Sequence, residues 1–241
     1  MIKVSEIFGP TIQGEGDMIG LPTLFLRVGG CDYRCVWCDT PHAVLSKYRK
    51  EWKPMTPAEI LTELELLAPA PYWVTVSGGN PAIQKIDELM QEDRTHNDVH
   101  YKWCLETQGS VHKKWFADLD RLVLSPKPPS SEQDVDLDIL DACMATKWLT
   151  PVTIKIVVFN DEDFKWAEMI FDRYKDFMST KKHTKILQVG NTTPKPGDEV
   201  SVSTMLINLD WLVKKSLDAG LHDVKVLPQL HSLLWGNRVG V

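Results

Sequence analysis

The sequence has 241 residues, of which 43% are hydrophobic and 25% charged, so it carries enough apolar material for a full core. A net charge of −6, without runs of lysine or arginine, argues against electrostatic capture of nucleic acid. No apolar stretch approaches the roughly 18 residues of a membrane span and the first residues lack a signal-peptide pattern, so we expect a cytoplasmic protein without a membrane segment.

Strand-like and helix-like runs alternate along the chain. The predicted strands, apolar and often β-branched, are 23–28, 72–76, 101–105, 121–124, 152–159, 185–189 and 224–227. The predicted helices are 57–67 after a capping box at Thr56, 83–90, a short one near 115, 137–148, 161–174 capped by Asp161, and 204–219. This order predicts a parallel sheet with right-handed crossovers. Because six or seven strands are too few to close an eight-stranded barrel, we predict an α/β fold, an open partial TIM-like barrel that forms a single domain over residues 1–241.

Three cysteines at C-x3-C-x2-C spacing, Cys31, Cys35 and Cys38, follow the first predicted strand and a Gly29-Gly30 pair. Such a loop can fold back so that the thiols converge. Three thiolates are one fewer than the usual set for an iron–sulfur cluster, so a 4Fe–4S cluster held here would keep one iron open to a ligand that is not protein. With His42 the same thiols could instead form a closed zinc site, or they could be unmetallated core residues.

The other two cysteines and the odd total of five indicate a protein without a disulfide framework. Cys104 and Cys143 lie among apolar residues and are expected to pack in the core. An odd number of cysteines, three of them clustered, does not suit a disulfide framework and is typical of a reducing compartment.

An unusual peptide follows almost every predicted strand. In parallel sheets the carboxyl ends of the strands share one edge, where chemistry gathers, so we expect these peptides to form one rim. Lys127, in a proline-rigid peptide of this rim, either meets a ligand oxygen or is solvated. The peptides are 29–31, 77–81, 106–109, 125–129, 188–191 and 228–231.

Several charged or polar side chains are candidates for ligand contacts. Gln13 and Glu15, in a glycine-rich segment before the first strand, can present an amide and a carboxylate to a flat heterocycle. Arg27, in an otherwise apolar strand, is a candidate for bidentate capture of a substrate carboxylate, with an internal ion pair as the alternative. Glu106 emerges from an apolar strand and needs a cationic or donor partner, supplied by a ligand or by the protein.

Two sets of motifs carry a resemblance. The cysteine spacing is that of the radical S-adenosylmethionine enzymes, and residues 77–81 resemble their G-G-E-P segment. Asn80 stands in place of the acid of that segment. A ligand ammonium would therefore depend more on backbone carbonyls and on Glu106. The chain is also similar to Bacillus-type members of the 7-carboxy-7-deazaguanine synthase family. The similar segments are 6–16, 77–81, 105–109, 125–129 and 228–237. The resemblance runs nearly from end to end of the chain.

That resemblance implies a function and a set of cofactors. The family is a group of carbon–nitrogen lyases that convert 6-carboxy-5,6,7,8-tetrahydropterin to 7-carboxy-7-deazaguanine with loss of ammonia, in queuosine and 7-deazapurine biosynthesis. The implied cofactors are a 4Fe–4S cluster, S-adenosylmethionine and Mg2+. An electron from a flavodoxin- or ferredoxin-type donor cleaves S-adenosylmethionine, and the resulting radical takes hydrogen from C6 of the pterin before the ring contracts. No side chain is expected to act as a general acid or base.

The same resemblance assigns roles to residues. Cys31, Cys35 and Cys38 would hold the cluster, and Thr40 would bind Mg2+ through its hydroxyl, with Asp39 close by. The expected cofactor contacts are Gly79, Glu106, Ser125, Pro126, Lys127, Gln188, Val189, Gly190 and Asn191. The expected substrate contacts are Ile12, Gln13, Gly14, Glu15, Arg27, Ser77 and the carboxylate of Val241. His231 and Trp235 are expected to pack or to anchor the tail.

The resemblance also implies a homodimer without direct contact to nucleic acid. Two other functions stay open at this stage. One is an activase that generates a glycyl radical on a partner protein and uses the same cysteine spacing. The other is a zinc-stabilised binding protein, which would be colourless.

Overall fold

A single curved sheet organises the molecule. The computed structural model describes residues 1–96, 98–145, 150–180, 182–194 and 197–241. Over these residues nine strands pair in the order β3-β1-β2-β4-β5-β6-β7-β8-β9. The strands are β1 (Ile2–Ile12), β2 (Pro22–Val28), β3 (Lys53–Met55), β4 (Trp73–Gly78), β5 (Lys102–Thr107), β6 (Arg121–Leu124), β7 (Val152–Val158), β8 (Thr184–Val189) and β9 (Val224–Leu227).

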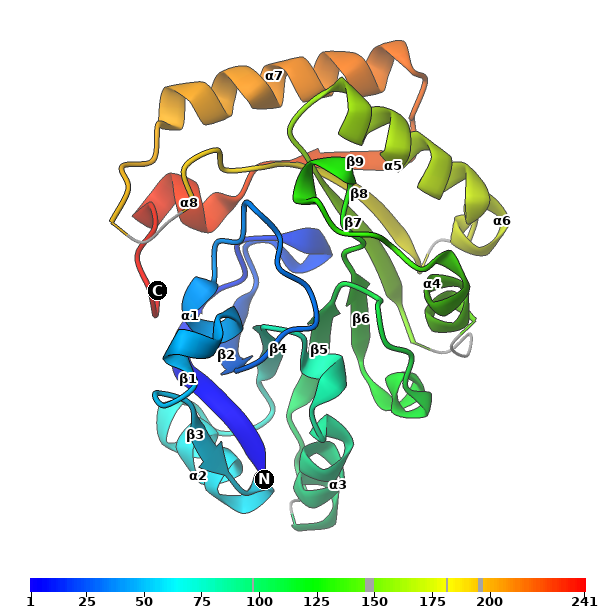
Figure 1. Ribbon diagram of the computed structural model, residues 1–241. Helices are drawn as coiled ribbons and strands as arrows, with labels where there is room; N and C mark the ends of the chain where they lie inside the picture. Colours follow the sequence, from blue (N-terminus) through cyan, green and yellow to red (C-terminus); the bar gives the residue numbers. More distant parts are fainter. Residues whose placement is uncertain (97, 146–149, 181, 195–196) are drawn as a thin grey trace.

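The seven strands from β2 through β9 that run parallel to one another are the seven predicted from the sequence. The described sheet has free edges at β3 and β9, so the predicted open partial barrel is confirmed. Figure 1 shows the strands as an arc, with the loop between β2 and α1 on its inner side.

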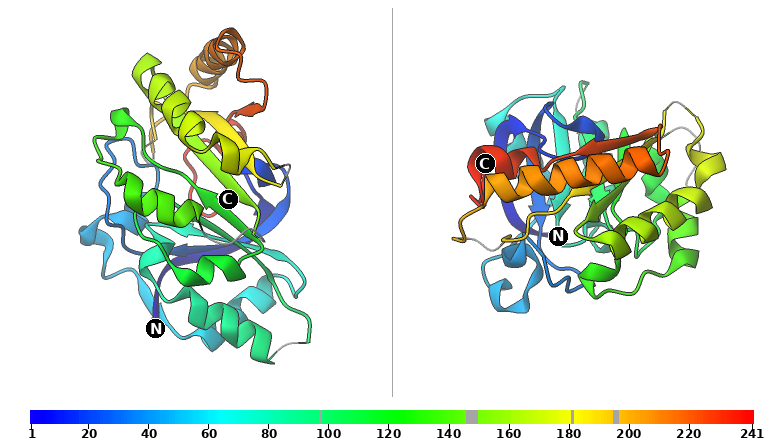
Figure 2. Two further views of the ribbon diagram at one scale, coloured as in Figure 1. Left: turned by 90° about the vertical axis from the view of Figure 1, so that its right-hand side faces the viewer. Right: turned by 90° about the horizontal axis from the view of Figure 1, so that it is seen from above.

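The helices lie mainly on the outer side of this arc, as the views in Figures 1 and 2 agree. They are α1 (Pro41–Val44), α2 (Pro57–Leu67), α3 (Ile86–His96), α4 (Leu137–Met144), α5 (Asp161–Arg173), α6 (Lys175–Met178), α7 (Val202–Asp218) and α8 (Leu230–Trp235). Short α1 and α8 lie instead near the open side of the arc. Within the described residues no helix is both long and apolar enough to cross a bilayer.

The main core lies between the outer face of the sheet and the helices. Side chains alternate along each strand, so one face of β2 contributes Leu24, Leu26 and Val28, which are fully buried together with Ile60 and Leu64 of α2. The intervening side chains of the strands point to the inner face. Burial of the outer set, and of matching residues on β4 to β8, supplies the main hydrophobic contribution to folding.

The helix starts agree with local sequence rules in most cases. Thr56 and Glu59 form the predicted capping box, in which the Glu59 backbone N–H donates to the Thr56 hydroxyl at 3.3 Å and the Thr56 N–H donates to the Glu59 carboxylate at 2.7 Å. The prediction that Asp161 caps α5 was wrong by one residue, because the side chain of Asn160 accepts from the Asp163 N–H. Asp161 is the first helical residue.

Two strands were missed. The glycine-rich segment 8–16 is not among the predicted strands, but residues 8–12 belong to β1, which pairs antiparallel with both β2 and β3. A register shift between Phe8 and Thr11, around Gly9-Pro10, breaks the period-two pattern by which a strand is recognised. Strand β3 is only three residues long. Of the helix predicted over 137–148, the part up to Met144 is helical, and 146–149 lie outside the described residues.

Candidate active site

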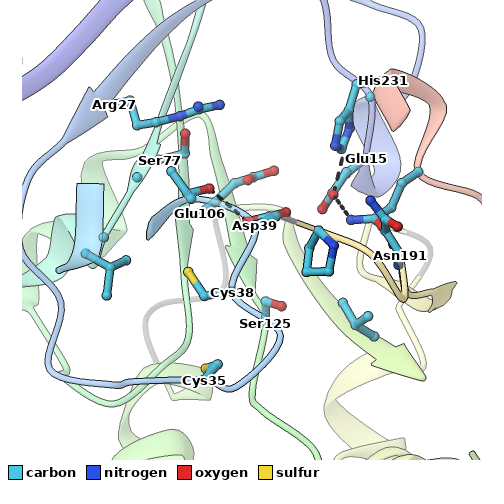
Figure 3. Close-up of a pocket in the computed structure, with 18 of the residues that line it drawn as sticks. Glu15, Arg27, Cys35, Cys38, Asp39, Ser77, Glu106, Ser125, Asn191 and His231 are labelled. Carbon is cyan, nitrogen blue, oxygen red and sulfur yellow. Dashed lines mark hydrogen bonds and ion pairs between the residues drawn. The ribbon is translucent and has the colours of Figure 1, made fainter. Parts of the chain in front are cut away.

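A cavity of roughly 220 Å³ opens on the inner side of the arc, at the carboxyl ends of the parallel strands. Its walls combine the cysteine loop with residues of β1, β2, β4, β5, β7 and the C-terminal segment, many of them drawn in Figure 3. This is the edge where the sequence placed the rim peptides. Most of the residues expected to contact ligands therefore meet in one cavity.

The cysteine loop is fixed to the ends of β2 and β4 by close backbone contacts. The Gly79 N–H donates to the Val28 carbonyl at 2.9 Å and the Asn80 N–H donates to the Gly30 carbonyl at 2.7 Å. A Cβ on Gly79 would lie 1.9 Å from the Gly30 carbonyl oxygen, so only glycine allows the two backbones to approach this closely. The glycines of both motifs thus bring the loop over the pocket.

All three thiols of the motif line the cavity, and each is free and half-buried. Burial raises the pKa of Cys31, Cys35 and Cys38 above the usual range, and the neighbouring Asp39 charge helps to raise that of Cys38 to about 12. Iron would have to displace the thiol protons, as metal ligation by cysteine requires. Three thiols on one wall, beside open space, fit a cluster with one iron accessible from the cavity.

The alternative zinc site requires His42 as a fourth ligand, and the structure gives this side chain a different partner. His42 Nε2 lies 3.0 Å from the Glu6 carboxylate, while its backbone carbonyl accepts from Trp52 at 2.8 Å. His42 is not among the residues that line the cavity with the thiols. The closed Cys3His arrangement is therefore not supported.

The Asn80 side chain forms hydrogen bonds that hold the cysteine loop and does not line the cavity. Its side-chain N–H2 donates to Asp32 at 2.7 Å and to Ser110 at 3.1 Å, and its oxygen accepts from Thr107 at 2.7 Å. Gln108 donates to the same Asp32 oxygen at 2.7 Å. The amide that replaces the acid of G-G-E-P is thus fully used in fastening the cysteine loop to the ends of β4 and β5.

Arg27 stands on one wall of the cavity, near Ser77 (Figure 3). Its guanidinium pairs with Glu6 at 2.7 Å and stacks over the Phe8 ring with 5.3 Å from Cζ to the centroid. The ion pair considered as an alternative therefore exists, and Arg27 also lines the cavity. Burial opposes ionisation of Glu6, but hydrogen bonding to His42 and the Arg27 charge outweigh it and lower the pKa of Glu6.

Glu15 and Glu106 belong to a buried charged group on the inner face that includes Lys155 of β7. Lys155 Nζ is in direct contact with Glu15 Oε2, and Gln229 donates to Glu15 Oε1 at 2.7 Å. Gln13 connects the two acids, because its N–H2 donates to Glu106 at 3.2 Å and its oxygen accepts from the Glu15 backbone at 3.1 Å. His231 Nδ1 lies 3.9 Å from Glu15.

The two acids of this group have opposite pKa shifts. Burial alone would raise the pKa of Glu15, but the Lys155 ammonium, together with His231 and Gln229, lowers it to about 2. Burial raises the pKa of Glu106 despite the attraction of Lys155, and the Glu15 charge adds to the rise. Glu15 is therefore the ionised partner of Lys155.

Asp39 comes close to this group without forming an evident metal site. Single ligand atoms of Glu15, Asp39 and His231 lie within 4.8 Å of one another. The Lys155 ammonium already neutralises Glu15 and would repel a metal cation bound to it, so these three residues are not assigned to a metal. Thr40, the expected Mg2+ ligand, lines the cavity and donates to Asp39 at 2.8 Å.

Not every expected contact residue reaches the cavity. Gln188 is fully buried on β8 and its amide has no hydrogen-bond partner among the described residues, Val189 packs in the outer core, and Gly190 lies against the Phe159 ring. Pro126 is likewise absent from the lining. The expected residues that do line it are Ile12, Gln13, Gly14, Glu15, Arg27, Cys31, Cys35, Cys38, Thr40, Ser77, Gly79, Glu106, Ser125, Lys127, Asn191 and Val241.

Among the lining residues that were not predicted as site residues, four are important for the chemistry of the cavity. Phe8 and Trp37 supply aromatic walls, Lys155 is the buried cation, and Gln229 fixes Glu15. The signal for Lys155 was present as one lysine inside the apolar run of β7, where an unpaired charge would be very costly.

Known proteins resemble the chain in sequence and in fold. Residues 26–127 match the family model of the Radical SAM superfamily. The chain is 40% identical over 243 residues to the 7-carboxy-7-deazaguanine synthase of Bacillus cereus, covering 100% of this chain and 99% of that protein. It is 41% identical over 247 residues to the Bacillus subtilis protein of the same name, with 100% and 98% covered. The crystal structure of QueE from Escherichia coli shares the fold, with a TM-score of 0.68 at 19% identity, covering 95% and 94% of the two chains.

Proposed function

The chain belongs to the 7-carboxy-7-deazaguanine synthase family of radical S-adenosylmethionine enzymes, and from this premise we propose that it converts 6-carboxy-5,6,7,8-tetrahydropterin to 7-carboxy-7-deazaguanine with loss of ammonia. The observation that most supports this reaction is one cavity that joins three free thiols, a cation on one wall and a carboxylate on the other. A small, flat and carboxylated heterocycle suits such a cavity.

Cys31, Cys35 and Cys38 would hold a 4Fe–4S cluster, leaving one iron to bind the amino and carboxylate groups of S-adenosylmethionine. When bound, this pair supplies the radical chemistry, and the protein positions the substrate and excludes water. Thr40 would contribute a hard oxygen ligand to Mg2+ beside the substrate.

The remaining contacts divide between cofactor and substrate. S-adenosylmethionine would lie against the Gly79 backbone and the rim peptides after β6 and β8, with Glu106 within reach. The proposed cofactor contacts that line the cavity are Gly79, Glu106, Ser125, Lys127 and Asn191, whereas Pro126, Gln188, Val189 and Gly190, which the resemblance also implied, do not line it. Arg27 would pair with the substrate carboxylate, because it is the cation opposite the acidic wall. The substrate set is Ile12, Gln13, Gly14, Glu15, Arg27, Ser77 and Val241.

We infer the partners and the location from the family relationship. A flavodoxin- or ferredoxin-type donor would reduce the cluster in the cytoplasm, and the product would enter queuosine or another 7-deazapurine. A homodimer is consistent with exposed apolar side chains on α7, where Leu206, Ile207 and Leu217 are 50%, 69% and 66% exposed.

An anaerobic reconstitution experiment tests the function. Protein loaded with iron and sulfide should be brown and give a reduced-cluster EPR signal that changes when S-adenosylmethionine is added. With dithionite and the carboxypterin it should release the deazaguanine product. Cofactor cleavage without any effect of the pterin would contradict the proposed substrate, and a colourless protein containing one zinc would contradict the cluster.

A further inference from the structure

Lys155 has no role in the proposed reaction, yet it lies at the floor of the cavity. It is the central residue of β7, is 4% exposed, and has buried neighbours on both sides in the strand. A buried ammonium strongly destabilises the fold unless it is paired and hydrogen-bonded. Its presence among the valines and isoleucines of β7 is therefore not explained by packing.

The direct contact of the Lys155 ammonium is with one carboxylate. Its Nζ contacts Oε2 of Glu15, and Gln229 fixes the other oxygen at 2.7 Å. The Glu106 carboxylate also attracts the ammonium, but the hydrogen bond to Glu106 comes from Gln13 at 3.2 Å. With one lysine between two acids, only one acid can be fully neutralised as an ion pair, and the direct contact selects Glu15.

Glu15 lies opposite Arg27 across the cavity (Figure 3). If the carboxylate of the proposed pterin pairs with Arg27, its other end meets the wall that holds Glu15. That end is a 2-amino-4-oxopyrimidine, whose 2-amino group and adjacent ring N–H are both donors. An ionised carboxylate accepts both, whereas a protonated one would turn a donor toward them.

We propose that Lys155 is a positioning residue that holds Glu15 as an acceptor-only carboxylate and thereby determines selectivity for the 2-amino group of the substrate. This inference rests on the proposed function. In a 2-oxo analogue one of the two donors becomes an acceptor, which would face the Glu15 carboxylate without a proton between them. A site whose buried carboxylate accepts hydrogen bonds rejects such an analogue strongly, because the carboxylate loses one of its donors and faces another acceptor.

The test measures dissociation constants by calorimetry on the holoenzyme with S-adenosylmethionine bound and no reductant, so that no turnover occurs. The two probes are 6-carboxytetrahydropterin and its 2-oxo counterpart. The wild type should prefer the 2-amino compound by about 100-fold or more. Lys155→Met should reduce this preference to about tenfold or less, and Lys155→Arg should restore most of it.

A matched control comes from the neighbouring strand. Lys185 of β8 is also paired with an acid, Asp223 at 2.7 Å, but its Nζ lies over Phe171 of the outer core. Lys185→Met should keep the wild-type preference. An unchanged preference in Lys155→Met, or an equal loss in Lys185→Met, would overturn the assigned role of Lys155.

If Lys155→Met does not fold, Lys155→Gln, which keeps a hydrogen-bond donor but removes the charge, replaces it and should likewise reduce the preference to about tenfold or less. In the Glu15→Gln background Lys155→Gln should change the preference no further, because the lysine acts through Glu15. An unchanged preference in Lys155→Gln, or a further loss in the double variant, would contradict the role. A wild type that binds neither pterin would refute the proposed function itself, whereas a selective wild type with a selective Lys155→Met variant refutes only the inference.

Discussion

The two faces of the sheet differ in what their side chains do, and β2 shows the difference within adjacent residues. Leu26 points outward and is fully buried against the helices, whereas Arg27 points inward to the cavity and pairs with Glu6 at 2.7 Å. On β7 the same alternation places Ile156 in the outer core and Lys155 on the inner floor.

The difference indicates how the fold can tolerate a charged interior. The outer face buries aliphatic side chains over the whole sheet, so it provides most of the stability. The inner face can then hold polar groups that contribute little to folding, provided each is paired. Changes on the two faces should therefore separate stability from function.

The largest effect is expected on the inner side, at the cysteine loop. Cys35→Ala removes one of three thiols that line the cavity, so cluster and product formation should both be lost completely. Cys143, buried in the outer core, is the matched control, and Cys143→Ala should keep the cluster. Iron content and the visible spectrum check both variants. A Cys35→Ala protein that still forms product would eliminate the assigned cluster site.

On the outer face the expected loss is in stability. Leu26→Ala leaves a cavity in a fully buried position and should lower the free energy of unfolding by about 2–5 kcal/mol. Its affinity for the pterin should not change, since the side chain points away from the cavity. Urea denaturation measures the free energy of unfolding and calorimetry measures the affinity for the pterin. A changed affinity at unchanged stability would contradict the assignment of stability to the outer face and of binding to the inner face.

The next effect concerns pH. Because the folded-state pKa of Glu15 is lowered to about 2 from a usual 4.5, its ionised form stabilises the fold above about pH 4.5. This contribution, at most on the order of 3 kcal/mol, is lost as the pH falls toward 2. The groups facing Glu15 are Lys155, His231, Glu106 and Asp39.

Unfolding free energies of the wild type and Glu15→Gln, measured from pH 7 down to pH 2, check this directly. The difference between the two proteins should be largest at neutral pH and shrink in acid. A difference that stays constant over the range would mean that Glu15 is not held ionised by its surroundings.

The sequence allowed much of this division to be predicted, because both faces leave local patterns. Each parallel strand is an apolar run that ends in glycine, proline or polar residues, and so strand positions and the rim were recognisable. Strand β1 was missed since the irregularity near Gly9-Pro10 disrupts its alternation.

The partners of charged residues could not be predicted in the same way. Lys155 and Glu15 are 140 positions apart, and Gln229 and Glu15 are 214 apart, so only the folded sheet brings them together. Asn80 gave a similar difficulty, because its use in fastening Asp32 depends on a loop contact that no local pattern encodes.

Arg27→Ala should have a smaller effect than loss of the cluster, confined to the substrate. Losing one charge-assisted interaction costs about 1.5–3 kcal/mol, or roughly 10- to 100-fold in affinity for the pterin. Reductive cleavage of S-adenosylmethionine should still occur, and stability should fall less than in Leu26→Ala. Calorimetric titration with the pterin checks this, and an unchanged dissociation constant would remove Arg27 from the substrate contacts.

The smallest effect is expected at a position on neither face. Thr56 caps α2 through the Glu59 N–H and is exposed together with Glu59, so Thr56→Ala should lower the free energy of unfolding by about 1 kcal/mol. Thr56→Ser keeps the hydroxyl and should be nearly neutral. Neither variant should alter the cluster or pterin affinity, because α2 lies outside the sheet. If Thr56→Ala weakened pterin binding, the outer helices would be coupled to the cavity, and the separation of the two faces would not hold.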